Sequence, residues 1–263
     1  MIIESAQNQY VKRLRSLASR KGRRQWGEFL VEGVRTLEEA LTCAAPLSYV
    51  AHCAELAESE RARELAERLR EAGARMLEVT ESVFRSFSQV QAPEGLAAAA
   101  VIPATVMDDL PAGADLLLAA VDVRDPGNMG ALVRLADAAG AQGCIAAGTC
   151  VDLYEPKVVR ATAGSIFHLP LVQDVAADDL IAWAARREIT TVATTLEGAE
   201  PYTAVSYPPR TLLMVGNEAH GLSAEVARRA DLKVYVPMPG LAESLNVAVA
   251  AGIVAYEIIR QRQ

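Results

Sequence analysis

The fold is set by a short apolar run and the polar loop after it: Leu116-Leu-Leu-Ala-Ala-Val121, then Asp122-Val-Arg-Asp-Pro-Gly-Asn-Met-Gly-Ala-Leu-Val-Arg134. Six consecutive apolar residues before a polar loop predict a strand that is buried on both faces, as strands of parallel sheets are. Pro126-Gly127 marks a turn. We expect a helix that starts near Met129, with Asn128 as its cap.

The same alternation of strand and helix continues to the end of the chain. It predicts an α/β fold with a mainly parallel sheet that is covered by helices on both faces. The expected strands are residues 116–121, 143–147, 190–194, 211–215 and 233–236. The expected helices are residues 130–139, 158–162, 178–186, 224–229 and 244–260.

The first hundred residues have an α/β pattern of their own. A basic helix is expected at residues 8–19, because Val11, Leu14 and Leu17 form one apolar stripe. Pro103, Pro111 and Gly113 then break the pattern. We therefore expect a small α/β domain at residues 1–103, a linker at 104–115 and a second domain at 116–263.

Composition excludes several classes of protein. With 263 residues, 51% hydrophobic and 22% charged, the chain can bury a core and is neither disordered nor of low complexity. No apolar run approaches the roughly 18–20 residues that span a bilayer, so we expect no membrane segment. The start of the chain has no secretory pattern. Four cysteines without a CxxC pair predict buried or free thiols of a reducing cytoplasm and no metal site.

Charge is distributed unevenly along the chain. The net charge is −7, yet the first 35 residues hold eight Lys and Arg against three Glu. A polyanion responds to such a local basic face, because screening limits the reach of each charge to about 10 Å. A solvated helix face is the alternative interpretation. The candidate residues for binding a polyanion such as RNA are Lys12, Arg13, Arg15, Lys21, Arg23 and Arg24.

Three loops follow expected strands and contain residues that suit a binding site. Ligands of parallel α/β sheets lie beyond the carboxyl ends of the strands, so these loops are expected to meet. The missing side chain of Gly216 is expected to let a flat ligand approach the backbone. The candidate residues are Asn128 and Arg134 in the first loop, Gly216 and Glu218 in the second, and Ser244 and Asn246 in the third.

Each loop also has a structural interpretation. Asn128 can be an ordinary cap, Gly216 an ordinary turn, and Ser244 the N-cap of the last helix. Asn246 must find a hydrogen-bond partner, because it lies at the start of an apolar helix. His220 is more typical of an exposed loop residue than of a base. The chain has no GxGxxG fingerprint, Walker loop or Ser–His–Asp arrangement.

Taken together, the three loops resemble the SpoU-type (TrmH-type) branch of the SPOUT superfamily of RNA methyltransferases over residues 119–261. The segment from Asp152 to Ser165 is similar to the linking segment of that family. Residues 8–12, 29–33 and 91–95 resemble a ribosomal-protein-like substrate-binding domain found in a subset of it. Ala248 departs from the Ser of many relatives. The strings are Asn128-Met-Gly130…Arg134, Gly216-Asn-Glu218…Gly221-Leu222 and Pro237-Met238…Glu243-Ser-Leu-Asn-Val247.

The resemblance implies transfer of a methyl group from S-adenosyl-L-methionine (AdoMet) to a ribose 2′-hydroxyl in RNA. It also implies a deep trefoil knot and a homodimer with its active site at the interface. The implied cofactor-binding residues are Thr194, Thr195, Leu196, Gly216, Asn217, Val236, Met238 and Leu245. The implied catalytic residues are Arg134, Asn128, Glu218, Ser244 and Asn246.

Arg134 is a poor general base, because the pKa of a guanidinium exceeds about 12. We expect it to orient a phosphate and to stabilise the developing alkoxide. The N-terminal domain resembles those of enzymes that act on large-subunit rRNA, and this resemblance implies 23S ribosomal RNA as the substrate in preference to transfer RNA. The alternatives are a tRNA 2′-O-methyltransferase and a non-catalytic dimeric module that binds AdoMet and RNA. An enzyme with a nucleotide cofactor would need a glycine-rich phosphate loop, which the chain lacks.

Overall fold

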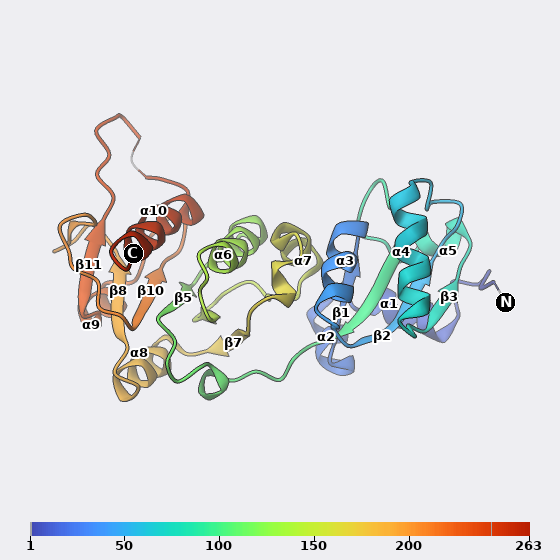
Figure 1. Ribbon diagram of the computed structural model, residues 1–263, viewed down its shortest axis with the longest axis horizontal. Coiled ribbons are helices and arrows are strands. Elements are labelled where there is room, and N and C mark those ends of the chain that lie inside the picture. The colour runs from blue at the N-terminus through green and yellow to red at the C-terminus, as the bar shows by residue number, and fades with distance from the viewer. Residues whose placement is uncertain (1, 243) are drawn as a thin grey trace. The chain divides into compact units, whose positions relative to one another are not determined.

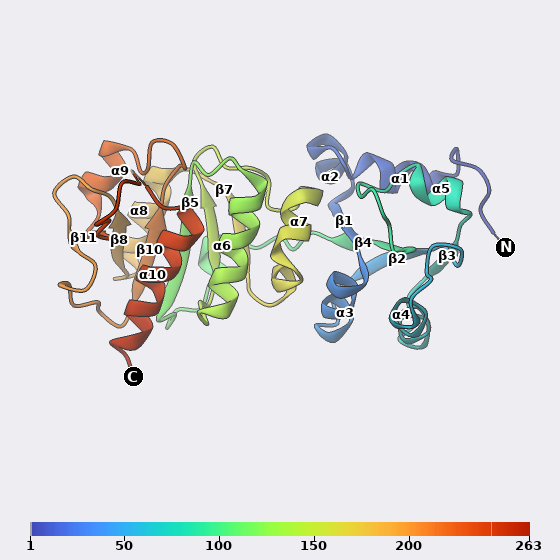
Figure 2. The same cartoon turned by 90° about the horizontal axis from the view of Figure 1, so that it is seen from above.

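The computed structural model describes residues 2–242 and 244–263, so Glu243 of the third string lies outside the described residues. The chain forms two compact units (Figures 1 and 2). The first unit contains the residues up to Ala104 together with Tyr154–His168, and the second contains Thr105–Leu153 and Leu169–Gln263.

The division differs from the expected domains in two segments. Tyr154–His168 belongs to the first unit, because Tyr154 and Phe167 pack on Phe29 with ring centroids 4.9 and 6.0 Å away. Most of the expected linker belongs to the second unit, whose core includes the buried Leu110 and Ala114. Contacts between residues that are far apart in the sequence decide to which unit each of the two segments belongs.

A four-stranded sheet organises the first unit, in the order β1-β4-β2-β3. β4 pairs antiparallel with β1 and β2, whereas β2 and β3 are parallel. Helices α1, α2 and α5 lie on one face of this sheet and α3 and α4 on the other (Figure 2). The strands are β1 (Glu28–Glu32), β2 (Leu47–His52), β3 (Met76–Glu78) and β4 (Leu96–Val101). The helices are α1 (Gln9–Ser16), α2 (Arg20–Trp26), α3 (Val34–Thr42), α4 (Glu60–Glu71), α5 (Glu81–Arg85) and α7 (Pro156–Thr162).

The basic segment forms two helices where one was expected. The apolar stripe is confirmed, since Val11, Leu14 and Leu17 are at most 1% exposed. However, the chain turns after α1, and the Ser19 side chain caps α2 by accepting from the Gly22 amide. A Cβ at Gly22 would lie 2.0 Å from the Ser16 carbonyl oxygen, so only glycine permits this turn.

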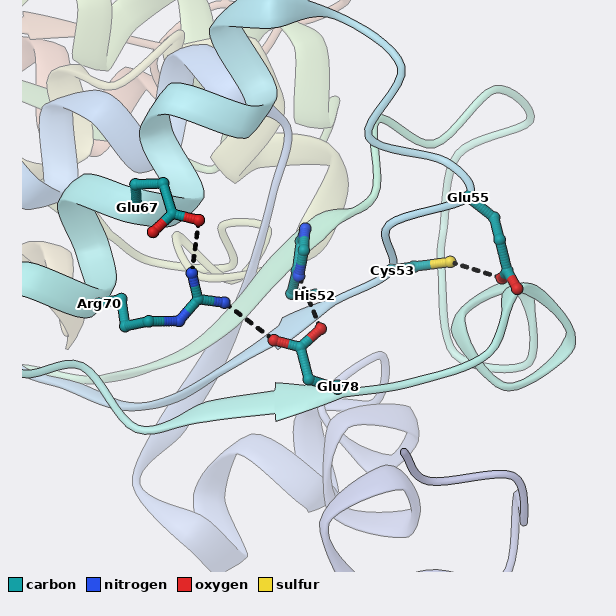
Figure 3. A network of polar contacts seen from close by, with 6 residues as sticks. All are labelled: His52, Cys53, Glu55, Glu67, Arg70 and Glu78. Atoms are coloured by element: carbon teal, nitrogen blue, oxygen red, sulfur yellow. Dashed lines mark hydrogen bonds and ion pairs between the residues drawn. The ribbon is translucent and has the colours of Figure 1, made fainter. Parts of the chain in front are cut away.

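A polar network ties β2, β3 and α4 together (Figure 3). Glu78 accepts from Arg70 at 3.0 Å and lies 2.7 Å from His52 Nδ1, while Arg70 also donates to Glu67. Beside it, the Cys53 thiol lies 3.4 Å from a Glu55 carboxylate oxygen, and burial raises the pKa of this thiol. These polar groups therefore satisfy one another within the first unit.

The second unit contains a seven-stranded sheet in the order β7-β6-β5-β10-β8-β11-β9. Its strand pairs are parallel, which confirms the expected parallel sheet. Strands β7 and β9 were not expected from the sequence. The strands are β5 (Leu116–Val121), β6 (Cys144–Ala147), β7 (Leu171–Val175), β8 (Thr190–Thr194), β9 (Glu200–Pro201), β10 (Thr211–Val215) and β11 (Leu232–Tyr235).

Helices cover both faces of this sheet, as expected. α6 (Pro126–Ala138) and α10 (Val247–Arg260) lie on one face, and α8 (Ala177–Arg186) and α9 (Ala224–Arg229) on the other (Figure 2). The core under α8 and α9 includes Trp183 and Leu212, both at most 2% exposed. The trefoil knot stays a prediction, because strand order does not define how loops thread.

Two expected helix caps are wrong. α6 begins at Pro126, and Asp125 is its cap, with Asn128 donating its backbone N–H to the Asp125 carboxylate at 2.8 Å. Proline at the first helical position after an aspartate is a common start signal. α10 begins at Val247, and Asn246, not Ser244, caps it by accepting from the Ala248 amide at 2.9 Å.

Candidate active site

The second unit has a cavity of about 790 Å³ beyond the carboxyl ends of β8, β10 and β11. Parallel α/β sheets bind ligands at this edge, and the volume lies in the range of small-molecule sites, about 300–1,000 Å³. All the residues that the resemblance assigns to the cofactor line it: Thr194, Thr195, Leu196, Gly216, Asn217, Val236, Met238 and Leu245.

Gly216 is required here for a different reason from the one expected. A Cβ at Gly216 would lie 2.1 Å from the Gly221 carbonyl carbon and 2.2 Å from the Leu222 nitrogen. The loop therefore folds back against its own start, and Asn217 and Gly221 exchange backbone hydrogen bonds of 2.8 and 3.0 Å. The glycine shapes the cavity wall through contact with protein backbone.

A chain of hydrogen bonds joins the three loops. Asn246 Nδ2 donates to Asn128 Oδ1 at 2.7 Å, and Asn128 Nδ2 donates to Glu218 Oε1 at 2.9 Å. Asn246 thus has the hydrogen-bond partner that was expected from its place at the start of an apolar helix. Glu218 lines the cavity, so this chain fixes a carboxylate at the cavity wall. The residues come from positions far apart in sequence, as the meeting of the loops predicts.

A further pair of contacts supports this arrangement. Asn217 Nδ2 donates to the Asp122 carbonyl at 3.0 Å, while Asn217 Oδ1 accepts from the Ala219 amide at 2.9 Å. Asp122 has a positive φ of 57° and accepts from the Thr149 amide. The second loop is therefore anchored to the end of β5.

The cavity wall combines apolar and charged side chains. Leu196 and Leu245 remain 69% and 37% exposed, so apolar surface faces solvent at the cavity. Ser244 also lines the cavity and is exposed. Three further charged residues line the cavity and were not predicted from any motif: Glu197, Arg228 and Lys233. His220 lines it as an exposed loop residue.

Arg134 is placed apart from the other candidate catalytic residues. It lies in the exposed part of α6, is not among the residues that line the cavity, and forms no hydrogen bond or ion pair with the residues that the structure describes. Asn128 and Arg134 are six residues apart on one helix, so they project in different directions. A single chain therefore assembles four of the five candidates.

The basic segment of the first unit divides into exposed and structural residues. Lys12, Arg15, Lys21 and Arg24 are exposed. Arg13 forms an ion pair with Glu28 and lies 4.3 Å above the Trp26 ring.

Arg23, another candidate RNA-binding residue, has a structural role in this unit. Its side chain is buried, with 3% of the residue exposed, and donates to the carbonyl oxygens of Leu17 and Ala18 at 2.9 and 3.1 Å. The guanidinium satisfies backbone acceptors after α1 and does not reach the surface. Composition cannot distinguish this use of arginine from an RNA contact.

The described residues contain no group of three or more His, Cys, Asp or Glu that could hold a metal ion. Within the same residues, no helix has both the length and the apolarity to cross a membrane. Among the described residues the four cysteines form no disulfide, and burial raises the pKa of Cys144 to about 12 and of Cys150 to about 11.

Comparison with known proteins is consistent with this geometry. The SpoU rRNA methylase family matches residues 115–256, and the MRM3-like substrate-binding domain matches residues 8–98. The chain is 35% identical to a 23S rRNA uridine 2′-O-methyltransferase of Streptomyces viridochromogenes, over 94% of this chain and 87% of that one. It is 33% identical to a 23S rRNA guanosine 2′-O-methyltransferase of Bacillus subtilis, over 97% and 98%.

Solved structures give the same result. The SpoU methyltransferase AviRb from Streptomyces viridochromogenes, in complex with the cofactor AdoMet, superposes with a TM-score of 0.88 at 32% identity. That match covers 97% of this chain and 98% of the other. The chain belongs to the SpoU rRNA methylase family.

Proposed function

We propose that this protein transfers the methyl group of AdoMet to a ribose 2′-hydroxyl of 23S ribosomal RNA. One observation carries the proposal: a cavity beyond the strand ends has Glu218 in its wall, held by Asn128 and Asn246. Full-length relatives at 33–35% identity act on the ribose of 23S rRNA, which supports the ribosomal substrate over transfer RNA.

The cavity fits AdoMet by its chemistry. Apolar side chains such as Leu196, Leu245 and Met238 suit an adenine ring, while Glu197 provides a carboxylate for an amino group or a sulfonium. The loop after Gly216 forms one wall from backbone, since its close return leaves no room for a side chain there. AdoMet supplies an activated methyl group when bound.

The residues of this chain position the acceptor. Methyl transfer by displacement requires the 2′-oxygen to lie about 3 Å from the methyl carbon and in line with the bond that breaks. The Asn246–Asn128–Glu218 hydrogen bonds fix one wall of the cavity before substrate arrives, so we assign these residues and Ser244 to the ribose pocket. Phosphate or water accepts the proton.

We assign Arg134 to a second copy of the chain. The side of α10 away from the cavity exposes Val249 and Tyr256 by 51% and 53%, and Tyr256 reaches the Ala138 carbonyl at the end of α6. Burial of this apolar face in a homodimer is favourable. Arg134 lies on α6, beside Leu135, which packs against Gly252 of α10. In the dimer the partner's Arg134 would complete the cavity, orient a phosphate and stabilise the alkoxide.

The exposed basic residues of the first unit explain how an acidic chain binds RNA. Lys12 and Lys21 present positive charge on the face of the sheet that carries α1 and α2. We place the enzyme in the cytoplasm, which cysteines that are not joined in disulfides support.

The test is transfer of labelled methyl from AdoMet to ribosomal and transfer RNA from cells that lack this protein, followed by alkaline hydrolysis. A 2′-O-methyl group protects the neighbouring phosphodiester, so label in alkali-resistant dinucleotides of 23S rRNA is the expected result. Label in mononucleotides would show base methylation and contradict the proposal. Label only in transfer RNA would support the alternative substrate. Absence of label despite AdoMet binding would favour a non-catalytic module.

A further inference from the structure

The first unit has a cavity of its own, about 280 Å³ in volume. It is lined by apolar side chains that include Phe84, Val90 and Leu96, and by four charged residues, Glu32, Arg35, Glu94 and Arg160. Glu32, at the end of β1, and Arg160, in α7, belong to strings that the sequence analysis singled out, and the methyl-transfer site uses neither.

Glu32 presents an unsatisfied acceptor. The residue is 5% exposed, and its Oε2 accepts from the Gln89 amide at 2.8 Å. Its Oε1 is buried and has no hydrogen-bond partner among the described residues. A buried polar atom without a partner destabilises the fold, so this oxygen is placed to receive a donor from outside the chain.

Arg160 presents an unsatisfied donor in the same cavity. Its Nη1 is buried and likewise lacks a partner in the described part of the chain. No ion pair joins Arg160 to Glu32 among those residues, although both line the cavity. The cavity therefore offers a free acceptor and a free donor, together with apolar walls.

These features match a nucleobase. Each base is an apolar ring whose edge carries an N–H donor next to a carbonyl or ring-nitrogen acceptor, and proteins read unstacked RNA bases on such edges. The liquid volume per water molecule is about 30 Å³, so the cavity is large enough for a ring. Arg35, which is exposed and also lines the cavity, can pair with the phosphate of the same nucleotide.

We propose that this cavity receives one unstacked base of the RNA substrate. An N–H of the base donates to Glu32 Oε1, and its neighbouring acceptor receives a hydrogen bond from Arg160 Nη1. This inference rests on the proposed function for the identity of the polymer. Guanine and uracil place a carbonyl beside the N–H, whereas adenine and cytosine place a ring nitrogen beside an amine, so the four bases are separate arms of the test.

The test is a titration of the full chain, labelled with ¹³C at Val and Leu methyl groups, with each of the four nucleoside 5′-monophosphates. We expect at least one nucleotide to shift the Val90 and Leu96 methyl signals saturably. The substitution Glu32→Gln changes the shape of the side chain very little. The side-chain carbonyl of the new glutamine can still accept the hydrogen bond from the Gln89 amide, and its NH₂ group then takes the place of Oε1 in the cavity. The substitution should weaken that binding about tenfold or more, whereas the matched control Glu71→Gln, an exposed residue of α4, should leave it unchanged.

A second measurement concerns the RNA. Glu32→Gln and Arg160→Met should raise the KM for 23S rRNA about tenfold and leave kcat and AdoMet affinity unchanged. Absence of Val90 and Leu96 shifts with all four nucleotides, with an unchanged KM, would overturn the inference and leave a cavity filled by water. The titration needs no methyl transfer, so failure of the proposed function is seen separately, as absence of product from the wild-type chain.

Discussion

The two units use polar side chains at their cavities in opposite ways. In the second unit, Glu218, Asn128 and Asn246 satisfy one another before any ligand binds. In the first unit, Glu32 and Arg160 keep buried atoms without partners among the described residues. A pre-formed network holds reactants in line, whereas unsatisfied groups are suited to recognising a ligand. The comparison assigns chemistry to the second unit and recognition to the first.

The largest effect is expected at Arg134. Arg134→Lys keeps the charge but loses the planar pair of donors that suits a phosphate, so turnover should fall roughly 10²–10³-fold. AdoMet affinity, measured by calorimetry, should stay within about twofold. Arg186→Lys, an exposed arginine of α8, is the matched control. Near-normal turnover of Arg134→Lys would remove this residue from the mechanism.

A second prediction concerns the hydrogen bonds that join Asn246, Asn128 and Glu218. Asn128→Ala removes the donor to Glu218 and the acceptor for Asn246, and turnover should fall about 10–100-fold, the equivalent of roughly 1–3 kcal/mol. Asn128→Asp should be worse than Ala, because it places a second carboxylate beside Glu218. Equal activity of the two variants would mean that Glu218 is not held as a charged group.

A third prediction concerns the exposed lysines of α1 and α2, which should contribute to RNA binding and not to turnover. Lys12→Ala together with Lys21→Ala should weaken RNA binding and reduce the slope of log affinity against log salt by roughly 1–2. Arg68→Ala, an exposed residue of α4 on the opposite face of the sheet, is the control. An unchanged slope would support the alternative interpretation, in which this segment is only a solvated helix face.

The smallest effect concerns acid stability of the second unit. Arg260 and Gln261 donate to Glu257 and hold its pKa down to about 2. A carboxyl group with a lowered folded pKa stabilises the fold above its ordinary pKa of 4.5 and loses that contribution as pH falls toward 2. Denaturant midpoints should therefore differ between wild type and Glu257→Gln at pH 6, and converge near pH 2. A constant difference would contradict this.

The meeting of the three loops could be predicted from the sequence, because carboxyl ends of parallel strands share one edge of a sheet. The caps at Asp125 and Asn246 were missed, although Asp-Pro before an apolar helix is a start signal. The placement of Tyr154–His168 could not be predicted, since it depends on Phe29, more than a hundred residues away. Arg23 shows the same limit, because its backbone acceptors exist only once α1 and α2 have folded.

The division of labour between the units is tested most directly by steady-state methylation of 23S rRNA. We would measure kcat and KM for wild type, Asn128→Ala and the Lys12→Ala, Lys21→Ala double variant at two salt concentrations. The account predicts a loss of kcat alone for Asn128→Ala, and a rise of KM alone, with weaker salt dependence, for the double variant. Loss of kcat in the double variant, or a KM effect alone for Asn128→Ala, would contradict it.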